Sequence, residues 1–487
     1  LVDPARGRAV LAVDRMSIRN IVYTVVDGGI VFGPTCDSVA RHPRVRRAID
    51  PQRLYDYLYF HMVPGPATVF RDLKRVAAGH FVEFENGKCS THPHWRPHFV
   101  ENSKADYASL KQTFRDTLTS AVRSYATPNG CGAFLSGGTD SSTISGLLGA
   151  VTCGPAQTFS IGFDADGFDE MHYARIAAAH FGTAQHEYYV TPDDVVDAIP
   201  RIAAIYDQPF GNASAIPTYY CARLARNHGI TRILGGDGGD ELFGGNARYA
   251  RQHQFARYEH APAVLRKGML EPLLRHLLFA DQVALLRKAK SYIAQASMPM
   301  PDRYESYNLL ERLGAENVLT PEFLGTVDRA GPIRHMRDVY QAADAGTLIN
   351  RMLALDFQFT MADNDLPKVT RMCELAGIDV AFPMLDDDLM DFSLTLAPSL
   401  KLRGTQLRYF FKRALSDFLP QEIITKEKHG FGLPVGAWLQ DHAGLRTLAG
   451  DAMLSLRGRG IVRPQFIDQL VDQHLATHAG YYGTMVW

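Results

Sequence analysis

The sequence is poor in cysteine, and its cysteines lie far apart. Six of them are spread over 487 residues, and no two have the CxxC spacing of a zinc site or a redox motif. A small secreted domain that depends on disulfides would contain many more cysteines for its length. We therefore expect reduced, mostly buried thiols, and we expect neither a structural zinc ion nor a disulfide framework.

Long apolar runs and an excess of charge of one sign are also missing. No stretch approaches the roughly 20 apolar residues that a membrane-spanning helix needs, and the first residues, LVDPARGRAV, lack the apolar region of a secretion signal. The formal net charge of -1 gives no overall basic field of the kind that attracts nucleic acid phosphates. These absences predict a cytoplasmic protein that binds neither membranes nor nucleic acids.

The composition that remains is typical of a multi-domain globular protein. Hydrophobic residues make up 46% of the chain and charged residues 21%, which is enough to bury more than one core. The chain begins with Leu1 rather than methionine and ends on apolar residues, so we expect a fragment of a longer protein. The sequence leaves a homodimer open.

Residues 1–95 have the pattern of a β-rich domain. The expected strands occupy residues 8–13, 20–26, 30–32 and 79–84. Asp27-Gly28 and Asn86-Gly87 are sequences that tight hairpin turns prefer. Proline and polar residues at 93–106 predict a linker after this first domain.

From residue 107 onward, strands are expected to alternate with helices. The expected strands cover residues 131–135, 157–163, 186–190 and 231–234. The expected helices cover residues 107–124, 144–151, 169–180, 216–228 and a stretch that begins at 193. This alternation predicts an α/β fold with a doubly wound, mostly parallel sheet covered by helices. From about residue 250 the pattern is mainly helical.

The segment Phe134-Leu135-Ser136-Gly137-Gly138-Thr139-Asp140-Ser141-Ser142 connects an expected strand to an expected helix. Its glycines let the backbone bend with amide groups pointing inward, and its last two serines begin the helix, where unpaired amides favour an anion. The carboxylate of Asp140 would repel a phosphate unless a divalent cation lay between them, and oxygen ligands suit Mg²⁺. The segment predicts a pyrophosphate site with a metal; a glycine-rich turn with serine and aspartate caps is the simpler alternative.

A second glycine-rich segment, Leu-Gly-Gly-Asp-Gly-Gly-Asp-Glu-Leu-Phe-Gly-Gly at residues 234–245, follows another expected strand. Ligands of doubly wound sheets bind beyond the carboxyl ends of the strands, so the two segments can meet in one crevice. Asp240 would then be a second carboxylate on the same Mg²⁺, and Asp237 is placed to accept a proton or orient an amine. The alternative, a solvated acidic turn, fits poorly with six glycines after a buried strand.

Five motifs follow one another along the chain. They are Ser136-Gly137-Gly138-Thr139-Asp140-Ser141-Ser142, Asp207-Gln208-Pro209-Phe210, the segment from Gly236 to Gly245, Phe382-Pro383-Met384-Leu385-Asp386 and Lys428-His429-Gly430-Phe431-Gly432. In this order they resemble the synthetase domain of glutamine-dependent asparagine synthetases, to which β-lactam synthetases and lasso-peptide cyclases are similar. The resemblance covers residues 104–487. It implies an ATP-dependent carbon-nitrogen ligase that activates a carboxylate as an acyl-adenylate, releases pyrophosphate and lets a nitrogen nucleophile displace AMP.

The resemblance also implies roles for individual residues. ATP would be bound by Phe134, Leu135, Ser136, Gly137, Gly138, Asp140, Ser141, Ser142, Ile161, Gly235 and Gly236. Asp140 and Asp240 would ligate Mg²⁺, and Asp237 and Lys428 would be catalytic. Lys428 would neutralise charge on the α-phosphate and on the tetrahedral intermediate; a solvated surface lysine is the ordinary alternative.

Three shorter motifs lie within residues 1–95. They are Val13-Asp14-Arg15-Met16-Ser17-Ile18, Val63-Pro64-Gly65-Pro66 and Ala78-Gly79-His80. They resemble the second half of the glutaminase domain of the same family. The nucleophilic cysteine of that domain would precede Leu1, so the printed chain is expected to be unable to hydrolyse glutamine. Its nitrogen would come from ammonia, or from glutamine through the missing half.

Two departures from the family pattern bear on the substrate. Lys368-Val369-Thr370-Arg371 has threonine where the family usually has aspartate, and Asp386-Asp387-Asp388 replaces the commoner Asp-His. We expect both changes to lie near the acyl pocket, where they would argue against aspartate as the substrate. Three alternatives to amidation remain: an intramolecular cyclase of the β-lactam or lasso type, another adenylating enzyme with a similar loop, and a non-enzymatic ATP-binding regulator.

Overall fold

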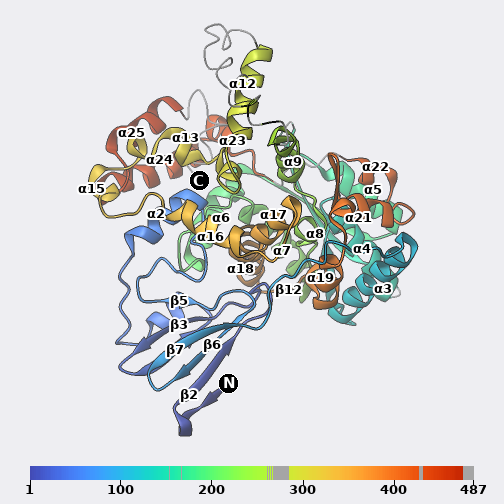
Figure 1. Cartoon of the computed structure of the whole chain (residues 1–487), viewed down its shortest axis with the longest axis horizontal. Coiled ribbons are helices and arrows are strands. Elements are labelled where there is room, and N and C mark those ends of the chain that lie inside the picture. Colours follow the sequence, from blue (N-terminus) through green and yellow to red (C-terminus); the bar gives the residue numbers. More distant parts are fainter. Residues whose placement is uncertain are drawn as a thin grey trace.

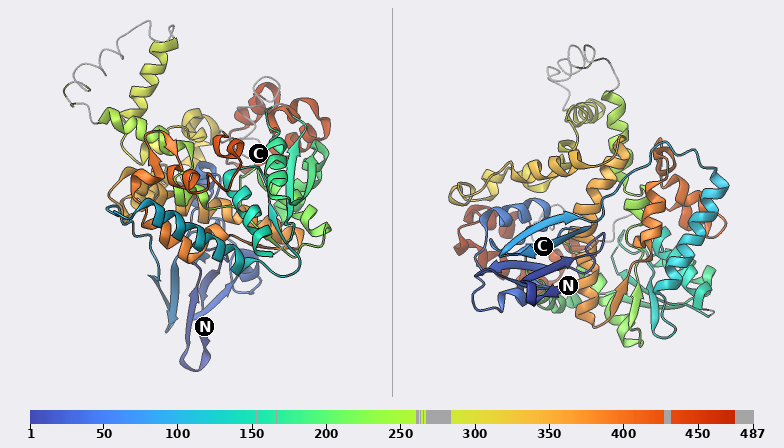
Figure 2. Two further views of the ribbon diagram at one scale, coloured as in Figure 1. Left: turned by 90° about the vertical axis from the view of Figure 1, so that its right-hand side faces the viewer. Right: turned by 60° about the horizontal axis from the view of Figure 1, so that its bottom comes forward.

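A computed structural model describes residues 1–152, 154–165, 167–259, 262, 264, 266, 284–426 and 432–474. The N-terminal strands project from a larger body in which helices surround a parallel sheet (Figure 1). The two further views in Figure 2 show the same arrangement, with one helix extending from the body well away from these strands. Within the described ranges, no helix is both long and apolar enough to cross a lipid bilayer.

The N-terminal region contains two small antiparallel sheets. One has the strand order β1-β2-β6-β7, and the other has the order β4-β3-β5. Their strands are β1 (Val2–Asp3), β2 (Arg8–Ala12), β3 (Val22–Val26), β4 (Gly29–Gly33), β5 (Lys74–Arg75), β6 (His80–Glu85) and β7 (Lys88–Pro93). Helices α1 (Cys36–Ala40) and α2 (Pro51–Phe60) lie between β4 and β5 in the chain. The β-rich segment that the sequence predicts is present.

Both hairpin turns have the backbone geometry that their sequences predict. Asp27 and Gly28 join β3 to β4 with φ angles of 51° and 76°, and Asn86 and Gly87 join β6 to β7 with the same two values. Positive φ at both central residues produces a turn whose twist matches that of the flanking strands. Each turn therefore fixes the register of its strand pair.

The segment between the two regions is held in place by hydrogen bonds. Phe99 is buried, and the carboxylate of Glu101 accepts hydrogen bonds from the amide and the hydroxyl of Thr347 at 2.8 and 2.6 Å. The side-chain amide of Asn350 donates a third, at 2.9 Å. The predicted linker at 93–106 is thus free of helices and contains only the end of β7, but it is bound firmly to the larger body.

Five parallel strands form the central sheet, in the order β10-β9-β8-β11-β12. The strands are β8 (Cys131–Phe134), β9 (Gln157–Phe163), β10 (Ala184–Val190), β11 (Arg232–Leu234) and β12 (Asp379–Ala381). Strands β9 and β10 follow β8 on one side of it, and β11 and β12 then lie on its other side. The prediction of an α/β fold with a parallel sheet is confirmed.

The helices that alternate with these strands pack around the sheet. They are α3 (Tyr107–Tyr125), α4 (Thr139–Thr152), α5 (Met171–Phe181), α6 (Pro192–Ile205) and α7 (Ala215–Asn227). Some of their ends carry typical helix-capping residues. Helix α6 begins with a capping box between Thr191 and Asp194, and α5 ends at Gly182, whose φ is 63°. Helices α3, α4 and α5 form one packed group, and α6, α7 and α18 form another.

The remainder of the described chain is mainly helical, as predicted. Its helices are α8 (Gly239–Phe243), α9 (Ala247–Glu259), α12 (Ala284–Ala296), η3 (Asp302–Glu305), α13 (Leu309–Leu313), α14 (Ala315–Val318), α15 (Pro321–Leu324), α16 (Gly331–Ala342), α17 (Leu348–Asp356), η4 (Phe357–Asp365), α18 (Leu366–Ala376), η5 (Pro383–Leu385), α19 (Asp387–Leu394), α20 (Pro398–Lys401), α21 (Tyr409–Ala414), α22 (Gln421–Thr425), α23 (Val435–Asp441), α24 (Ala443–Leu456), η6 (Arg457–Arg459), α25 (Pro464–Gln469) and η7 (Leu470–His474). Sequence patterns miss β12 and the short hairpin of β13 (Leu402–Arg403) and β14 (Gln406–Leu407), because strands of two or three residues have too few positions to show an alternation.

Candidate functional site

The two glycine-rich segments meet at one edge of the parallel sheet. They follow β8 and β11, which are neighbours, with Leu234 paired to Ala133. A cavity of about 1240 Å³ opens there, and we call it the loop cavity. The predicted site residues that line it are Phe134, Leu135, Ser136, Gly138, Asp140, Ser141, Ile161, Gly236, Asp237 and Asp240. The convergence expected from the sequence is therefore present.

Three predicted residues shape the segments without lining the loop cavity. A Cβ atom on Gly137 would lie 2.5 Å from the backbone of Tyr173 and Ala174, so glycine is needed where this turn packs on α5. Ser142 is 0% exposed and lies within α4. A Cβ atom on Gly235 would come within 3.1 Å of the Phe382 ring. The two glycines are needed for the backbone path, while the Ser142 hydroxyl is buried without a hydrogen-bond partner among the described residues.

Hydrogen bonds within the first segment orient its serines. The Ser136 amide donates to the Ser141 hydroxyl at 3.1 Å, and the two serine hydroxyls lie 3.0 Å apart. The Ser141 hydroxyl is also 3.3 Å from the Gly138 carbonyl oxygen. Across the crevice, a Cβ atom on Gly236 would lie 2.8 Å from the Ser141 amide nitrogen, so glycine allows the two segments to touch.

Asp140 and Asp240 converge on a single cationic side chain, that of Arg408. The Asp140 carboxylate accepts two hydrogen bonds of 2.5 Å from the two terminal nitrogens of this guanidinium. The Nη2 atom of Arg408 also donates to Asp240. Both carboxylates therefore lie within reach of one cation, as the metal hypothesis requires.

The surroundings of the two carboxylates fit a small divalent cation. A Cβ atom on Gly239 would overlap the Asp140 carboxylate, and one on Gly245 would overlap the Asp240 carboxylate and the Arg408 side chain. Glycine thus leaves room for oxygen ligands in this cradle. A pair of carboxylates suits Mg²⁺, since this ion is often held by one or two carboxylates together with phosphate oxygens and water.

One part of the loop cavity contains acidic groups around one lysine. The Lys368 ammonium lies 2.9 Å from the Asp365 carboxylate, and Asp237 and Glu241 line the same region. Burial raises the pKa of Asp237 to about 6, although Lys368 acts against this shift. Burial lowers the pKa of Lys368, but the charges of Asp365 and Asp237 outweigh it and raise the pKa overall.

Glu241 is 5% exposed, and burial, together with the charges of Asp365 and Asp356, raises its pKa from 4.5 to about 8. As pH rises from about 4.5 to about 8, the unfolded chain releases this proton while the folded protein retains it, so the free energy of unfolding falls across that window. Glu241→Gln removes the titration, and we expect it to be more stable than the native protein by about 1 kcal/mol or more near pH 8.5, with little difference near pH 5.

Urea denaturation at both pH values measures this difference. Glu316→Gln is the control, since that carboxylate is exposed and paired with Arg329, and its pH profile should follow that of the native protein. Equal pH dependence for native protein and Glu241→Gln would contradict the assignment.

Basic residues that the sequence patterns do not reveal also line the loop cavity. Arg408, Lys412 and Lys426 lie there, and Lys426 is 3.0 Å from Glu170. Burial lowers the pKa of Lys412, with the charge of Arg408 adding to the effect. No spacing in the sequence marks these residues, because Arg408 follows the β13–β14 hairpin, Lys412 lies on α21 and Lys426 ends α22. Lys428, predicted to be catalytic, lies outside the described residues.

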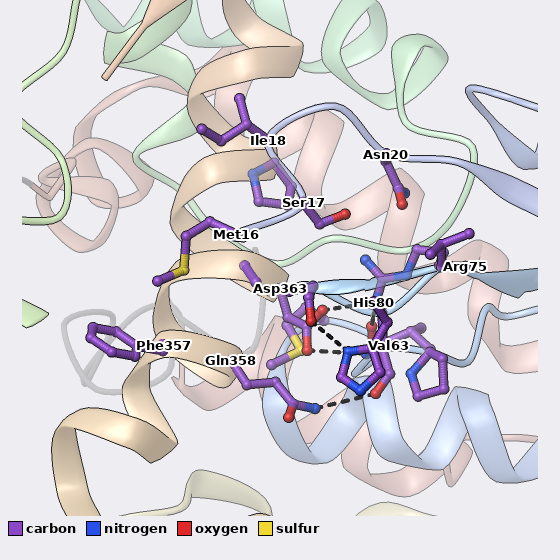
Figure 3. A pocket seen from close by; sticks show the side chains of 18 of the residues that line it. Met16, Ser17, Ile18, Asn20, Val63, Arg75, His80, Phe357, Gln358 and Asp363 are labelled. Carbon is purple, nitrogen blue, oxygen red and sulfur yellow. Dashed lines mark hydrogen bonds and ion pairs between the residues drawn. The ribbon is translucent and has the colours of Figure 1, made fainter. Parts of the chain in front are cut away.

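A second cavity, of about 720 Å³, lies between the N-terminal sheets and helices η4 and α18; we call it the interface cavity. Arg75 and Asp363 face each other in it (Figure 3), with a hydrogen bond of 3.0 Å. Asp363 also accepts a bond from the Gly65 amide at 3.0 Å. The Gln358 side chain donates to the Gly65 carbonyl at 3.2 Å.

The Lys368-Val369-Thr370-Arg371 motif is divided between the two cavities, with Lys368 and Val369 at the loop cavity, and the Asp207-Gln208-Pro209-Phe210 motif lies at the interface cavity. The motif at 207–210 lines it, and its Gln208 accepts a hydrogen bond from the Val69 amide at 3.2 Å. Thr370 also faces this cavity, and its hydroxyl donates to the Leu366 carbonyl at 2.7 Å. Helices η4 and α18 form the wall between the two cavities, since Met361 faces one and the adjacent residue 362 the other.

Neither family departure lies in the lining of the loop cavity. Thr370 lines the interface cavity instead, and Asp387 forms an ion pair of 3.0 Å with Arg15. Asp386 caps the start of α19 by accepting a hydrogen bond from the Asp388 amide. That these departures bear on the acyl substrate stays a prediction.

Comparisons with known proteins agree with the motifs. The asparagine synthase family model matches residues 113–487, and a glutamine amidotransferase domain model matches residues 1–95. Asparagine synthetase [glutamine-hydrolyzing] 1 of Bacillus subtilis is 25% identical over 475 residues, which are 96% of this chain and 72% of that protein. A putative asparagine synthetase [glutamine-hydrolyzing] of Mycobacterium tuberculosis is 27% identical over 409 residues, which are 80% of this chain and 59% of that protein.

Solved structures add no argument of their own. An NH3-dependent NAD synthetase from Campylobacter jejuni has 12% sequence identity and a TM-score of 0.20, and the likeness covers 40% of this chain and 98% of that one. The family assignment rests on the sequence models and the relatives. By that match over residues 113–487, the chain belongs to the asparagine synthase family.

Proposed function

We propose that this chain uses ATP to activate a carboxylate as an acyl-adenylate, releases pyrophosphate, and transfers the acyl group to a nitrogen nucleophile. The observation that carries the proposal is the meeting of Asp140 and Asp240 at one cation position beside a glycine-lined crevice. Two carboxylates from separate loops have little reason to approach so closely unless a positive charge lies between them. Family membership supports the same chemistry.

The nucleotide would lie across the mouth of the crevice. Ser136, Gly138 and Ser141 would bind the pyrophosphate part, because the turn and the first residues of α4 present amides and hydroxyls there. Phe134, Ile161 and Gly236 would surround the adenine, and Gly235 would shape the backbone next to them. Mg²⁺, held by Asp140 and Asp240, would neutralise the charge of the phosphates.

The acyl transfer would take place in the part of the loop cavity that contains Asp237 and Lys368. Burial raises the pKa of Asp237 to about 6, so at neutral pH its carboxylate can accept a proton from the amine or ammonia nitrogen as this attacks the acyl carbon. Lys368, Arg408 and Lys412 would supply positive charge for a substrate carboxylate and its adenylate. Lys428 would neutralise charge on the α-phosphate, as the family resemblance implies.

The nitrogen donor and the domain organisation belong to the same proposal. We assign residues 1–95 to a glutamine amidotransferase-like domain and residues 104–487 to the synthetase domain. The nitrogen would be ammonia or be derived from glutamine. Aspartate is the first carboxylate to test, because the relatives are named asparagine synthetases.

Product analysis tests the proposed reaction. The protein is incubated with MgATP, ammonium and a panel of carboxylates that begins with aspartate, and the nucleotide products are separated. We expect AMP and pyrophosphate in equal amounts, with formation dependent on one carboxylate. Formation of ADP and phosphate would contradict an adenylate, and binding of ATP without turnover by any carboxylate of the panel would favour a regulator.

A further inference from the structure

Arg408 holds an unusual backbone conformation at the mouth of the loop cavity. It follows the β13–β14 hairpin and has a φ of 54°, a left-handed value that costs a non-glycine residue roughly 1 kcal/mol. Its amide donates to the Gly244 carbonyl at 3.1 Å, within the second glycine-rich segment. Residues in strained conformations persist where the surrounding contacts hold them, and such positions are concentrated at functional sites.

The Arg408 side chain joins the two glycine-rich segments. It is 7% exposed and forms a two-pronged contact with Asp140, while the same guanidinium donates to Asp240 and to the Thr139 hydroxyl. A planar guanidinium suits two carboxylates in this way, and it suits a phosphate equally well. Arg408 thus occupies the place at which the proposed metal ion would bind.

Charge makes the two occupants mutually exclusive. Asp140 and Asp240 carry two negative charges, and Arg408 balances one of them. A divalent cation balances both, and at ligand distance from the same oxygens it would repel the guanidinium strongly in this half-buried place. Once such an ion binds, the Arg408 guanidinium no longer has the carboxylates as partners. The phosphate groups of the nucleotide are then the anions with which it can pair.

We propose that Arg408 is the counter-cation that keeps Asp140 and Asp240 together without nucleotide. When a metal-bound nucleotide enters, a divalent cation replaces the guanidinium between the two carboxylates, and the guanidinium pairs with the phosphate groups instead. The inference rests on the proposed function, since it assumes a metal-bound nucleotide. Arg408 is a positioning residue. It makes metal binding depend on nucleotide binding, because the metal alone must displace a guanidinium that is already paired with both carboxylates.

Titration with Mn²⁺, in the absence of nucleotide, tests this competition in Arg408→Asn. Asparagine is the suitable replacement because it is neutral and tolerates a left-handed φ better than most residues. We expect Mn²⁺ alone to bind the variant about tenfold more tightly than the native protein, within the range typical of coupled sites. Adding pyrophosphate should tighten Mn²⁺ binding in the native protein and do so much less in the variant.

Arg115→Gln is the matched control. Arg115 is also paired with an aspartate, Asp417, and contacts a backbone carbonyl at 3.0 Å, but it does not line the loop cavity. Its Mn²⁺ affinity should equal that of the native protein. If Arg408→Asn does not fold, Arg408→Gly replaces it, since glycine adopts φ near 54° without strain.

The outcomes separate the inference from the proposed function. Mn²⁺ affinity in the folded variant that is no higher than in the native protein overturns the competition, even if the native protein forms AMP. Tighter Mn²⁺ binding in the variant supports the competition, even if no carboxylate yields AMP and the proposed reaction fails. A purely structural arginine would change stability and leave the coupling between Mn²⁺ and pyrophosphate unaltered.

Discussion

Replacement of Asp140 by alanine is expected to lower carboxylate-dependent exchange of pyrophosphate into ATP by about 10³-fold or more, a loss of roughly 4 kcal/mol of transition-state stabilisation. The variant removes one of two carboxylates that meet at the proposed metal position. Without it, the negative charge of the phosphates is no longer neutralised beside the pyrophosphate segment. Exchange of labelled pyrophosphate, measured with saturating carboxylate, reports the adenylation step alone.

The second carboxylate supplies a stricter form of the same test. Asp240→Ala should match the loss in Asp140→Ala, and the double variant should be hardly worse than either, because groups that act on one ion are strongly non-additive. Asp37→Ala is the control; this residue forms an exposed ion pair with Arg47 in the N-terminal region. An Asp140→Ala protein that retains native exchange would refute the metal assignment, and fully additive losses would argue against a shared ion.

The features that the sequence predicts well are those set by local chemistry. Asn-Gly and Asp-Gly specify hairpin turns because such turns need positive φ, which these residues tolerate. The central strand β9 is buried along almost its whole length, as expected for a parallel sheet covered on both faces. The meeting of the two glycine-rich segments follows from the alternation of strands and helices, since neighbouring parallel strands end at the same edge of a sheet.

The part of the site that the sequence does not predict depends on tertiary contacts. Arg408 follows a two-residue strand, and nothing in its neighbours indicates that its side chain reaches Asp140, 268 positions earlier in the chain. Lys368 stands out in the sequence only as part of a family motif, and its pairing with Asp365 is visible only in the folded protein. The position of Thr370 is hard to predict for the same reason: a helix has several faces, and the sequence alone does not say which one meets which cavity.

Lys368→Met is expected to be the most destabilising single replacement at the site. The lysine is the cation in a group of acids formed by Asp365, Asp237 and Glu241, all of which raise its pKa. Removing one partner of a largely buried ion pair leaves an uncompensated charge, which typically costs about 3 kcal/mol or more. Methionine keeps most of the volume, so the loss measures charge rather than packing. Urea denaturation near neutral pH gives the free energy of unfolding.

A double variant separates the ion pair from the rest of the cluster. Lys368→Met combined with Asp365→Asn removes both charges of the 2.9 Å contact, so it should recover much of the stability that the single variant loses. Lys426→Met is the comparison, since it breaks the other lysine pair of the cavity, that with Glu170, away from the acidic cluster. If the double variant is no more stable than Lys368→Met, the lysine acts through packing, and the balance of charge proposed for the acyl end of the cavity is wrong. Recovery would instead mean that the remaining acids can protonate, as the raised pKa values of Asp237 and Glu241 predict.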